Sequence, residues 1–141
     1  MRLLVRREHG AHELASKLQQ KGFIAEDVQE AIAECQRLGL QSDLRFVDNV
    51  SRARIRQGYG PTRIRQELLT LHIERELIED RLQQEQDSWL SYALAAWEKK
   101  FKEHEQHSFA MQQKQKQFLL YRGFTTDTIA QVFKELRVIM V

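Results

Sequence analysis

The chain has 141 residues, of which 42% are hydrophobic and 30% charged, and this length suits one ordinary domain or three small helical modules. Only six glycines and one proline occur, and no apolar run is long enough for a signal peptide or a membrane span, so we expect an all-α protein of the cytoplasm. A formal net charge of +2 excludes nucleic-acid binding by bulk attraction alone.

Apolar periodicity predicts a series of helices along the chain. In chain order they cover residues 2–8, 11–21, 25–38, 42–57, 61–71, 74–85, 88–107, 110–122 and 126–137. Gly10, Gly22 and Gly123 can end helices in a left-handed conformation. Ser42 and Thr125 can cap the helices that follow them, because their side-chain oxygens can accept the first free amides.

The helical pattern repeats after about 50 residues, which is typical of tandem helical modules. The positions Leu14, Leu18, Gly22, Phe23, Val28 and Ile32 correspond to Ile64, Leu68, His72, Ile73, Ile78 and Leu82, and then to Gln115, Leu119, Gly123, Phe124, Ile129 and Phe133. Chance similarity between amphipathic helices is the alternative, but the recurring Gly-Phe turn favours a true repeat. We predict three-helix repeats at 1–40, 41–86 and 87–141, packed in series into an elongated array, straight or curved.

The second copy has His72-Ile73 where the others have Gly-Phe. A histidine enters the left-handed region less readily than glycine, so we expect this turn to differ in its backbone angles.

The strongest charge bias lies between Val50 and Gln66, where five arginines and no acid occur. On a helical wheel of residues 42–57, Arg45, Arg52 and Arg56 project opposite an apolar stripe. That stripe consists of Phe46, Val47, Val50, Ala53 and Gln57. The arginines form either a solvated face paired with nearby acids or a docking face for an acidic partner or for phosphates. Arg63 and Arg65 extend the basic region beyond the helix.

The loop Gln57-Gly58-Tyr59-Gly60-Pro61 lies among these arginines. Its two glycines bring the backbone close to the surface, and an exposed Tyr59 could stack on a base or anchor a protein interface. The alternative is a simple turn in which Tyr59 packs back on its own repeat.

The long helix near residue 100 carries Trp89, Trp97 and Phe101 at spacings typical of a core stripe. Lys99 and Lys100 belong to a second basic cluster on the same helix, which neighbouring glutamates partly offset.

Metal binding and catalysis find little support in the sequence. His104 and His107 are three residues apart, as are His9 and His12, but neither pair has an evident third ligand. Cys35 is the single cysteine and is expected to be a buried thiol. With neither a phosphate-binding loop nor a local catalytic cluster, we expect no cofactor, no metal and no enzyme activity.

Several segments, in order and with matching spacing, resemble the RecX family of bacterial RecA regulators. They are Arg6-Arg7-Glu8-His9, Gly22-Phe23, Leu38-Gly39-Leu40-Gln41-Ser42-Asp43, Arg45-Phe46, Gly58-Tyr59-Gly60-Pro61 with Ile64-Arg65-Gln66-Glu67-Leu68, and Arg122-Gly123-Phe124. The run from Gly60 to Leu68 is the most specific of these. The family pattern has further residues ahead of Arg6-Arg7, so we expect the first repeat to be short at its start.

The resemblance implies a monomeric, noncatalytic regulator that binds the RecA filament on single-stranded DNA, in its helical groove. Such a regulator would restrain filament growth, ATP hydrolysis, repressor cleavage and strand exchange. The residues that we expect to contact the RecA filament or DNA are Arg45, Arg52, Arg56, Tyr59, Arg63, Arg65, Lys99 and Lys100. Two alternatives remain: a small basic module that binds single- or double-stranded DNA directly, and a helical scaffold without either partner.

Overall fold

The computed structural model describes residues 8–101 and 108–140, the last three by their backbone alone. Within these ranges the chain forms helices and no strand, which confirms the all-α prediction. The helices are α2 (Ala11–Gln20), α3 (Ala25–Arg37), α4 (Asp43–Arg56), α5 (Pro61–Thr70), α6 (Arg75–Gln83), α7 (Trp89–Lys100), α8 (Phe109–Tyr121) and α9 (Thr126–Met140). None of these described helices has the length and apolar character needed to cross a membrane. The predicted helix 2–8 lies outside the described residues except for Glu8, which is not helical.

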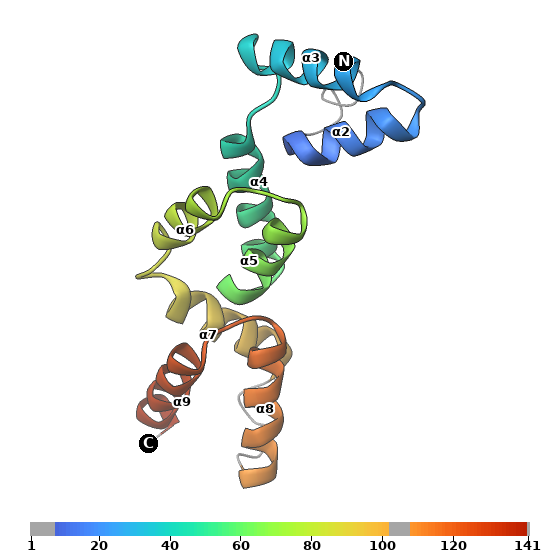
Figure 1. Ribbon diagram of the computed structural model, residues 1–141. Coiled ribbons are helices and arrows are strands. Elements are labelled where there is room, and N and C mark those ends of the chain that lie inside the picture. Colours follow the sequence, from blue (N-terminus) through green and yellow to red (C-terminus); the bar gives the residue numbers. More distant parts are fainter. Residues whose placement is uncertain (1–7, 102–107, 141) are drawn as a thin grey trace.

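The helices form an elongated array of three tiers (Figure 1). The hairpin of α2 and α3 lies at one end, α4 to α6 form the middle tier, and α7 to α9 lie at the other end. The three helices of the middle tier pack on one another, and so do those of the last. The predicted architecture of tandem three-helix repeats is therefore confirmed, with two helices of the first repeat described.

Burial follows the repeat. Leu14, Ile64 and Gln115 occupy the same position of successive copies, and the side chain of each is fully buried. Gln115 replaces an apolar residue there, and its Oε1 accepts a hydrogen bond from Nε1 of Trp97 at 3.1 Å. Buried residues of the second and third repeats form one continuous core, which includes the predicted stripe of Trp89, Trp97 and Phe101. The first repeat has a small core of its own, made by Leu14, Val28 and Ile32.

The turn between the second and third helices has a left-handed residue and the same hydrogen bond in every repeat. Gly22 and Gly123 are left-handed, with φ of 98° and 97°, and His72 is also left-handed, with φ of 60°. The His72 turn thus differs in its backbone angles, as predicted, because its φ of 60° is well below the 98° and 97° of the two glycines, although all three residues are left-handed. In each copy the next amide donates to a carbonyl five residues back: Phe23 to Leu18 at 3.2 Å, Ile73 to Leu68 at 3.1 Å, and Phe124 to Leu119 at 3.1 Å.

Two predicted caps are confirmed. The Ser42 hydroxyl accepts the amide of Arg45 at 3.2 Å, and the Thr125 hydroxyl accepts the amide of Thr128 at 3.2 Å. Pro61 begins α5, where its missing N–H costs no helical hydrogen bond.

The long helix near residue 100 ends earlier than predicted. α7 stops at Lys100, and Phe101 is extended, with φ of −120° and ψ of 130°. The Phe101 ring is buried and meets the Phe118 ring edge-on at 5.4 Å between centroids. This packing directs the chain out of the helix, so the prediction of an unbroken helix through this point is wrong; residues 102–107 lie outside the described part.

A backbone contact joins the second repeat to the third. The amide of Gly60 donates to the carbonyl of Arg122 at 2.8 Å, and the amide of Thr62 donates to the carbonyl of Gly123 at 3.0 Å. A Cβ atom on Gly60 would lie 2.6 Å from the carbonyl carbon and oxygen of Gly123. Only glycine at position 60 allows the two backbones to come this close. We call the contact between Gly60 and Thr62 on one side and Arg122 and Gly123 on the other the glycine joint.

The first repeat meets the second at the corresponding place. Gly10 aligns with Gly60, and a Cβ atom on it would lie 3.2 Å from Cδ1 of Ile73. The rings of His12 and His72 stack across this boundary with centroids 3.9 Å apart. The prediction that Gly10 ends a helix in the left-handed region is wrong: its φ is −72°, because it is the extended residue that precedes α2. The loops ahead of α2 and α5, the second helices of the first two repeats, thus each contact the turn of the following repeat.

Replacing Gly60 by alanine tests the glycine joint. The φ of −100° at Gly60 suits alanine, so the expected loss comes from steric overlap alone. We expect Gly60→Ala to lower the free energy of unfolding by roughly 2–3 kcal/mol, measured by chemical denaturation. Gly10→Ala is the matched control and should cost clearly less, because its new methyl group meets movable side chains. Equal stability of Gly60→Ala and the parent chain would contradict the joint.

Candidate partner-binding site

Helix α4 has the predicted two faces, with one difference. Phe46 and Val47 are buried, and the arginine face opposite them is exposed. Gln57, predicted at the end of the apolar stripe, is instead exposed, because α4 ends at Arg56 and the chain turns there. Ser51 is the buried residue of the last turns.

Three of the predicted contact arginines are held by acids of the chain itself. Each is partly exposed, but its guanidinium already has a carboxylate partner. The pairs are Arg45 with Glu8 at 2.9 Å, Arg52 with Asp48 at 3.1 Å, and Arg65 with Glu79 at 2.6 Å. The hydrogen bond from Arg65 lowers the pKa of the Glu79 carboxyl, although partial burial opposes the shift. For these three residues the structure favours the paired, solvated face.

Arg54 is committed in the same way. Its Nε lies 2.8 Å from Oε2 of Glu67 and its Nη2 lies 2.6 Å from Oε1, which is a bidentate pair. This hydrogen bonding is the main reason that the pKa of the Arg54 guanidinium is raised.

Other predicted residues come together in a cavity between the second and third repeats. Arg56, Lys99 and Lys100 line it together with Arg122, and its volume is about 310 Å³. None of the described residues that line it is acidic. We call this cavity, with its four cations, the basic pocket.

The local reason for these cations is the ends of the helices. Arg56 lies in the last turn of α4, Lys99 and Lys100 lie in the last turn of α7, and Arg122 caps α8. The carboxyl end of a helix carries partial negative charge, which a cation stabilises. The helix end on which each cation lies accounts for that cation by itself. Because three such helix ends converge, positive charge is concentrated in one place.

A stack of aromatic rings and guanidinium groups runs beside the basic pocket. The Tyr59 ring lies between Arg63, at 4.6 Å from guanidinium carbon to ring centroid, and Arg122, at 4.7 Å. Arg63 also lies 5.4 Å from the Tyr121 ring, and Arg122 lies 5.3 Å from the Phe118 ring. We call these five residues the Tyr59 stack. Tyr59 is thus half-buried between its own repeat and the next.

The walls of the basic pocket are neutral and aromatic. Tyr92 and Phe118 line it, and the Tyr92 hydroxyl donates to Oε2 of Glu85 at 2.5 Å. This hydrogen bond raises the pKa of the Tyr92 phenol, which therefore stays neutral at physiological pH. Arg122 is oriented by a hydrogen bond from its Nη1 to the carbonyl of Gln57 at 3.1 Å. A cavity with a cationic rim and aromatic walls can bind an anionic group that carries a flat apolar part.

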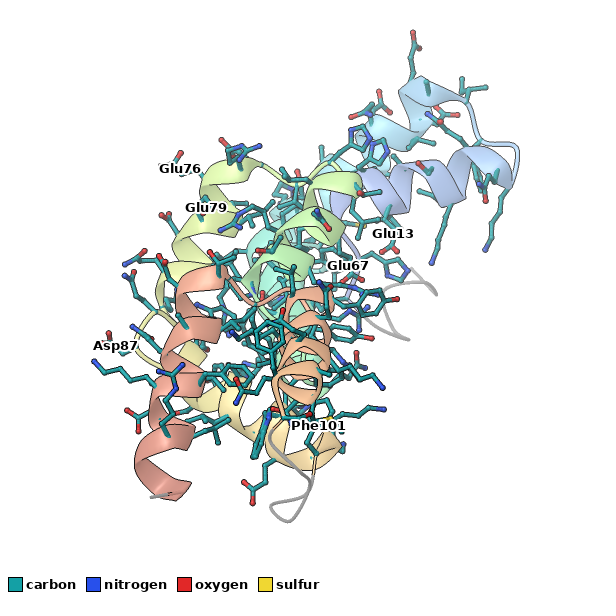
Figure 2. All side chains as sticks on the ribbon, turned by 90° about the horizontal axis from the view of Figure 1, so that it is seen from below. Glu13, Glu67, Glu76, Glu79, Asp87 and Phe101 are labelled. Carbon is teal, nitrogen blue, oxygen red and sulfur yellow. The ribbon has the colours of Figure 1, made fainter. Side chains whose placement is uncertain are left out.

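Several acidic side chains of the array do not line the basic pocket. Figure 2 shows Glu76, Glu79 and Asp87 along one edge of the molecule and Phe101 away from them, beside the carboxyl end of α7. Glu13 and Glu67 lie near each other in the same view and line a common cavity. These five acids therefore lie outside the basic pocket, whereas Glu85 reaches its Tyr92 wall through a hydrogen bond.

The structure divides the predicted contact residues into three groups. Arg56, Lys99 and Lys100 meet at the basic pocket, Tyr59 and Arg63 meet in the adjoining stack, and Arg45, Arg52 and Arg65 are elsewhere. Sequence reasoning missed Arg122, Tyr92, Phe118 and Tyr121. The position of Arg122 immediately before the repeated Gly-Phe turn was the available signal, because that turn faces the preceding repeat.

The histidine pairs do not form a metal site in the described part of the chain, where no group of three or more metal-binding side chains gathers. His9 is buried with its Nε2 3.1 Å from Nζ of Lys17, whereas His12 faces His72. His104 and His107 lie outside the described residues. The free thiol of Cys35 is buried, as predicted.

Comparison with protein families gives three matches in series. The first three-helix domain of RecX matches residues 1–35, the second matches residues 42–82, and the third matches residues 86–133. Among similar curated proteins, a regulatory protein RecX of Legionella pneumophila is 58% identical over 137 residues, covering 97% of this chain and 91% of the relative. A regulatory protein RecX of Haemophilus influenzae is 39% identical over 130 residues, covering 91% of this chain and 86% of the relative.

Solved structures support the same fold. The crystal structure of RecX from Lactobacillus salivarius superposes with a TM-score of 0.85 at 24% identity, covering 97% of this chain and 91% of that one.

The Tyr59 stack can be tested through stability. Tyr59→Ala removes the ring that lies between two guanidinium groups, and we expect it to lower the free energy of unfolding by about 1–2 kcal/mol. Tyr59→Phe keeps the ring and should stay within a few tenths of a kcal/mol of the parent, roughly the effect of a neutral surface change. Urea denaturation measures both. If the two variants lose equal stability, the stack is not held by its ring.

Proposed function

Because the chain belongs to the RecX family of regulatory proteins, we propose that it is a noncatalytic inhibitor that binds the RecA filament on single-stranded DNA. It would lie in the helical groove of the filament and restrain filament growth, ATP hydrolysis, repressor cleavage and strand exchange. The observation that carries this proposal is the basic pocket, where four cations converge without a lining acid on an array of serial repeats.

The serial repeats support binding to a partner that is itself repetitive. Each repeat contacts its neighbours, so the array is long relative to its width and can reach more than one subunit of a filament (Figure 1). The basic pocket lies where two repeats share a core, so a partner that binds there contacts a rigid surface. Rigidity lowers the entropy cost of binding.

The charge distribution supports a defined orientation on the partner. Glu76 and Glu79 of the second repeat lie along one edge of the molecule (Figure 2) and do not line the basic pocket. Segregated charges of opposite sign steer a protein toward a complementary surface and disfavour the reversed orientation. The partner surface facing the pocket should therefore be acidic or should expose phosphates.

Direct DNA binding is the second candidate function, and the Tyr59 stack favours it. Tyr121 is largely exposed at the open end of this stack, and the pocket beside it carries the cations. Single-stranded nucleic acid is bound by this combination of stacking platforms and positive grooves. In this case the protein would bind DNA without any recombinase.

An ATP-hydrolysis assay of RecA on single-stranded DNA tests the leading proposal. The parent protein should inhibit hydrolysis, whereas a variant with Arg56→Glu, Lys99→Glu and Lys100→Glu should need at least about tenfold more protein for half inhibition. This factor reflects roughly 0.5–1 kcal/mol for each reversed charge. No hydrogen bond or ion pair of these three side chains is seen in the described structure, so the fold should persist, as circular dichroism would show.

A variant with Lys114→Glu, Lys134→Glu and Arg137→Glu is the matched control. It changes the net charge by the same amount at exposed positions of α8 and α9, away from the basic pocket. Equal loss of inhibition in both variants would mean that net charge, and not the pocket, governs binding. Unchanged hydrolysis with saturating parent protein would contradict the inhibitor proposal itself.

Salt dependence separates the two candidate functions. If the four cations of the pocket contact phosphates, the logarithm of the affinity for a single-stranded oligonucleotide should fall with the logarithm of salt concentration with a slope near −3, following about −0.7 per contact. Fluorescence anisotropy measures this without recombinase. The leading proposal expects negligible oligonucleotide binding in that experiment at physiological salt.

A further inference from the structure

The turn of the first repeat lacks the cover that its counterparts have. In the second and third repeats the apolar residue after the left-handed position is buried, with Ile73 4% exposed and Phe124 1% exposed. The loop of the preceding repeat approaches each of them: Gly10 lies against the Ile73 side chain, and Gly60 lies against the backbone of Gly123 and Phe124. At the same place in the first repeat, Phe23 is 55% exposed and Ile24 is 62% exposed.

The backbone of the Gly22 turn has the conformation that Gly123 has in the glycine joint. Gly22 and Gly123 have almost the same φ, 98° and 97°. In the glycine joint the carbonyls of Arg122 and Gly123 accept two amides from the preceding loop. The corresponding carbonyls of the first repeat are those of Lys21 and Gly22, and no donor reaches them within the described part of the chain.

The side chain at the next position also differs. Ile24 precedes α3, and the corresponding residues of the later repeats are the polar Glu74 and Thr125. Thr125 caps its helix, whereas neither Ile24 nor Glu74 provides a capping hydrogen bond. An exposed isoleucine at a helix start gains neither capping nor burial. The exposed side chains of Phe23 and Ile24 lie next to the carbonyls of Lys21 and Gly22. Together they form a surface that corresponds to the Arg122-Gly123 side of the glycine joint.

We propose that the Lys21-Gly22-Phe23-Ile24 turn docks an extended, glycine-containing loop that precedes a helix on a recombinase subunit. The inference rests on the proposed function for the identity of the partner. The loop would donate two backbone amides to the carbonyls of Lys21 and Gly22 and cover Phe23. It would carry glycine because a Cβ atom at that position of the glycine joint would lie 2.6 Å from backbone atoms.

A second copy of the chain does not offer such a loop among its described residues. The loops that contain Gly10 and Gly60 are already engaged by the turns of the second and third repeats. The corresponding position of the third repeat is Met111, which has a large side chain and lies inside α8, because that helix begins at Phe109. The occupant is therefore a different protein.

Binding to RecA filaments assembled on single-stranded DNA tests this docking site. Phe23→Asp should weaken binding at least tenfold, measured by cosedimentation of the full chain with filaments. Phe109→Asp is the matched control, because Phe109 is 78% exposed at the other end of the array, and it should bind within twofold of the parent. Both side chains are largely exposed, so circular dichroism should show unchanged helicity.

A photoreactive side chain at position 24 identifies the occupant. We expect it to crosslink to one segment of the recombinase, in which a glycine lies shortly before a helix. Crosslinks only to a second copy of the chain or to DNA would overturn the docking site, as would parent-like binding by Phe23→Asp. Failure of the parent chain itself to bind filaments would contradict the proposed function, and with it the docking site. Binding by the parent chain that Phe23→Asp leaves unchanged would contradict the docking site alone.

Discussion

The glycine joint is the contact on which the rest of the structure depends. Gly60 and Gly123 let two backbone segments approach within hydrogen-bonding distance. A single methyl group on either glycine would overlap atoms of the opposite segment. This approach gives the second and third repeats one continuous core. It also brings Arg122, at the turn of the third repeat, against Tyr59 of the second. The Tyr59 stack and the basic pocket therefore follow from a steric condition at two glycines.

The same kind of joint is built with different chemistry at the first repeat. There the loop glycine meets side chains instead of backbone, and stacked His12 and His72 rings lie where the glycine joint has amide-to-carbonyl hydrogen bonds. The buried residues of the first repeat form a separate cluster. Less shared apolar area means that less free energy opposes a change of angle at this boundary. The first repeat is thus the part of the array best able to adjust to a partner.

Sequence reasoning predicted the features that are local in the chain. Ser42 and Thr125 cap helices through residues three positions away, and the left-handed turns depend on a few neighbouring residues. Even Gln115, which broke the apolar pattern, occupies its repeat position, because Trp97 supplies a buried donor. Prediction failed where the surroundings of a side chain depend on residues far away in the sequence. Arg45 appeared available until the fold placed Glu8 beside it, and the role of Arg122 could not be predicted before the glycine joint was known.

Pairing explains how a chain with little net charge can still present a selective surface. Arg45, Arg52, Arg54 and Arg65 are each paired with an acid of the chain, and for Arg54 and Arg65 that acid comes from another helix. Among the described residues, the cations without such a partner include those that line the basic pocket. That pocket and the open turn of the first repeat lie in different tiers of the array (Figure 1). Two modest contacts on one chain strengthen each other when a partner offers both sites at the right spacing, because the second contact forms at high effective concentration. On the proposed function, a filament of repeated subunits would offer both sites at a fixed spacing, so binding by this chain would depend on filament assembly.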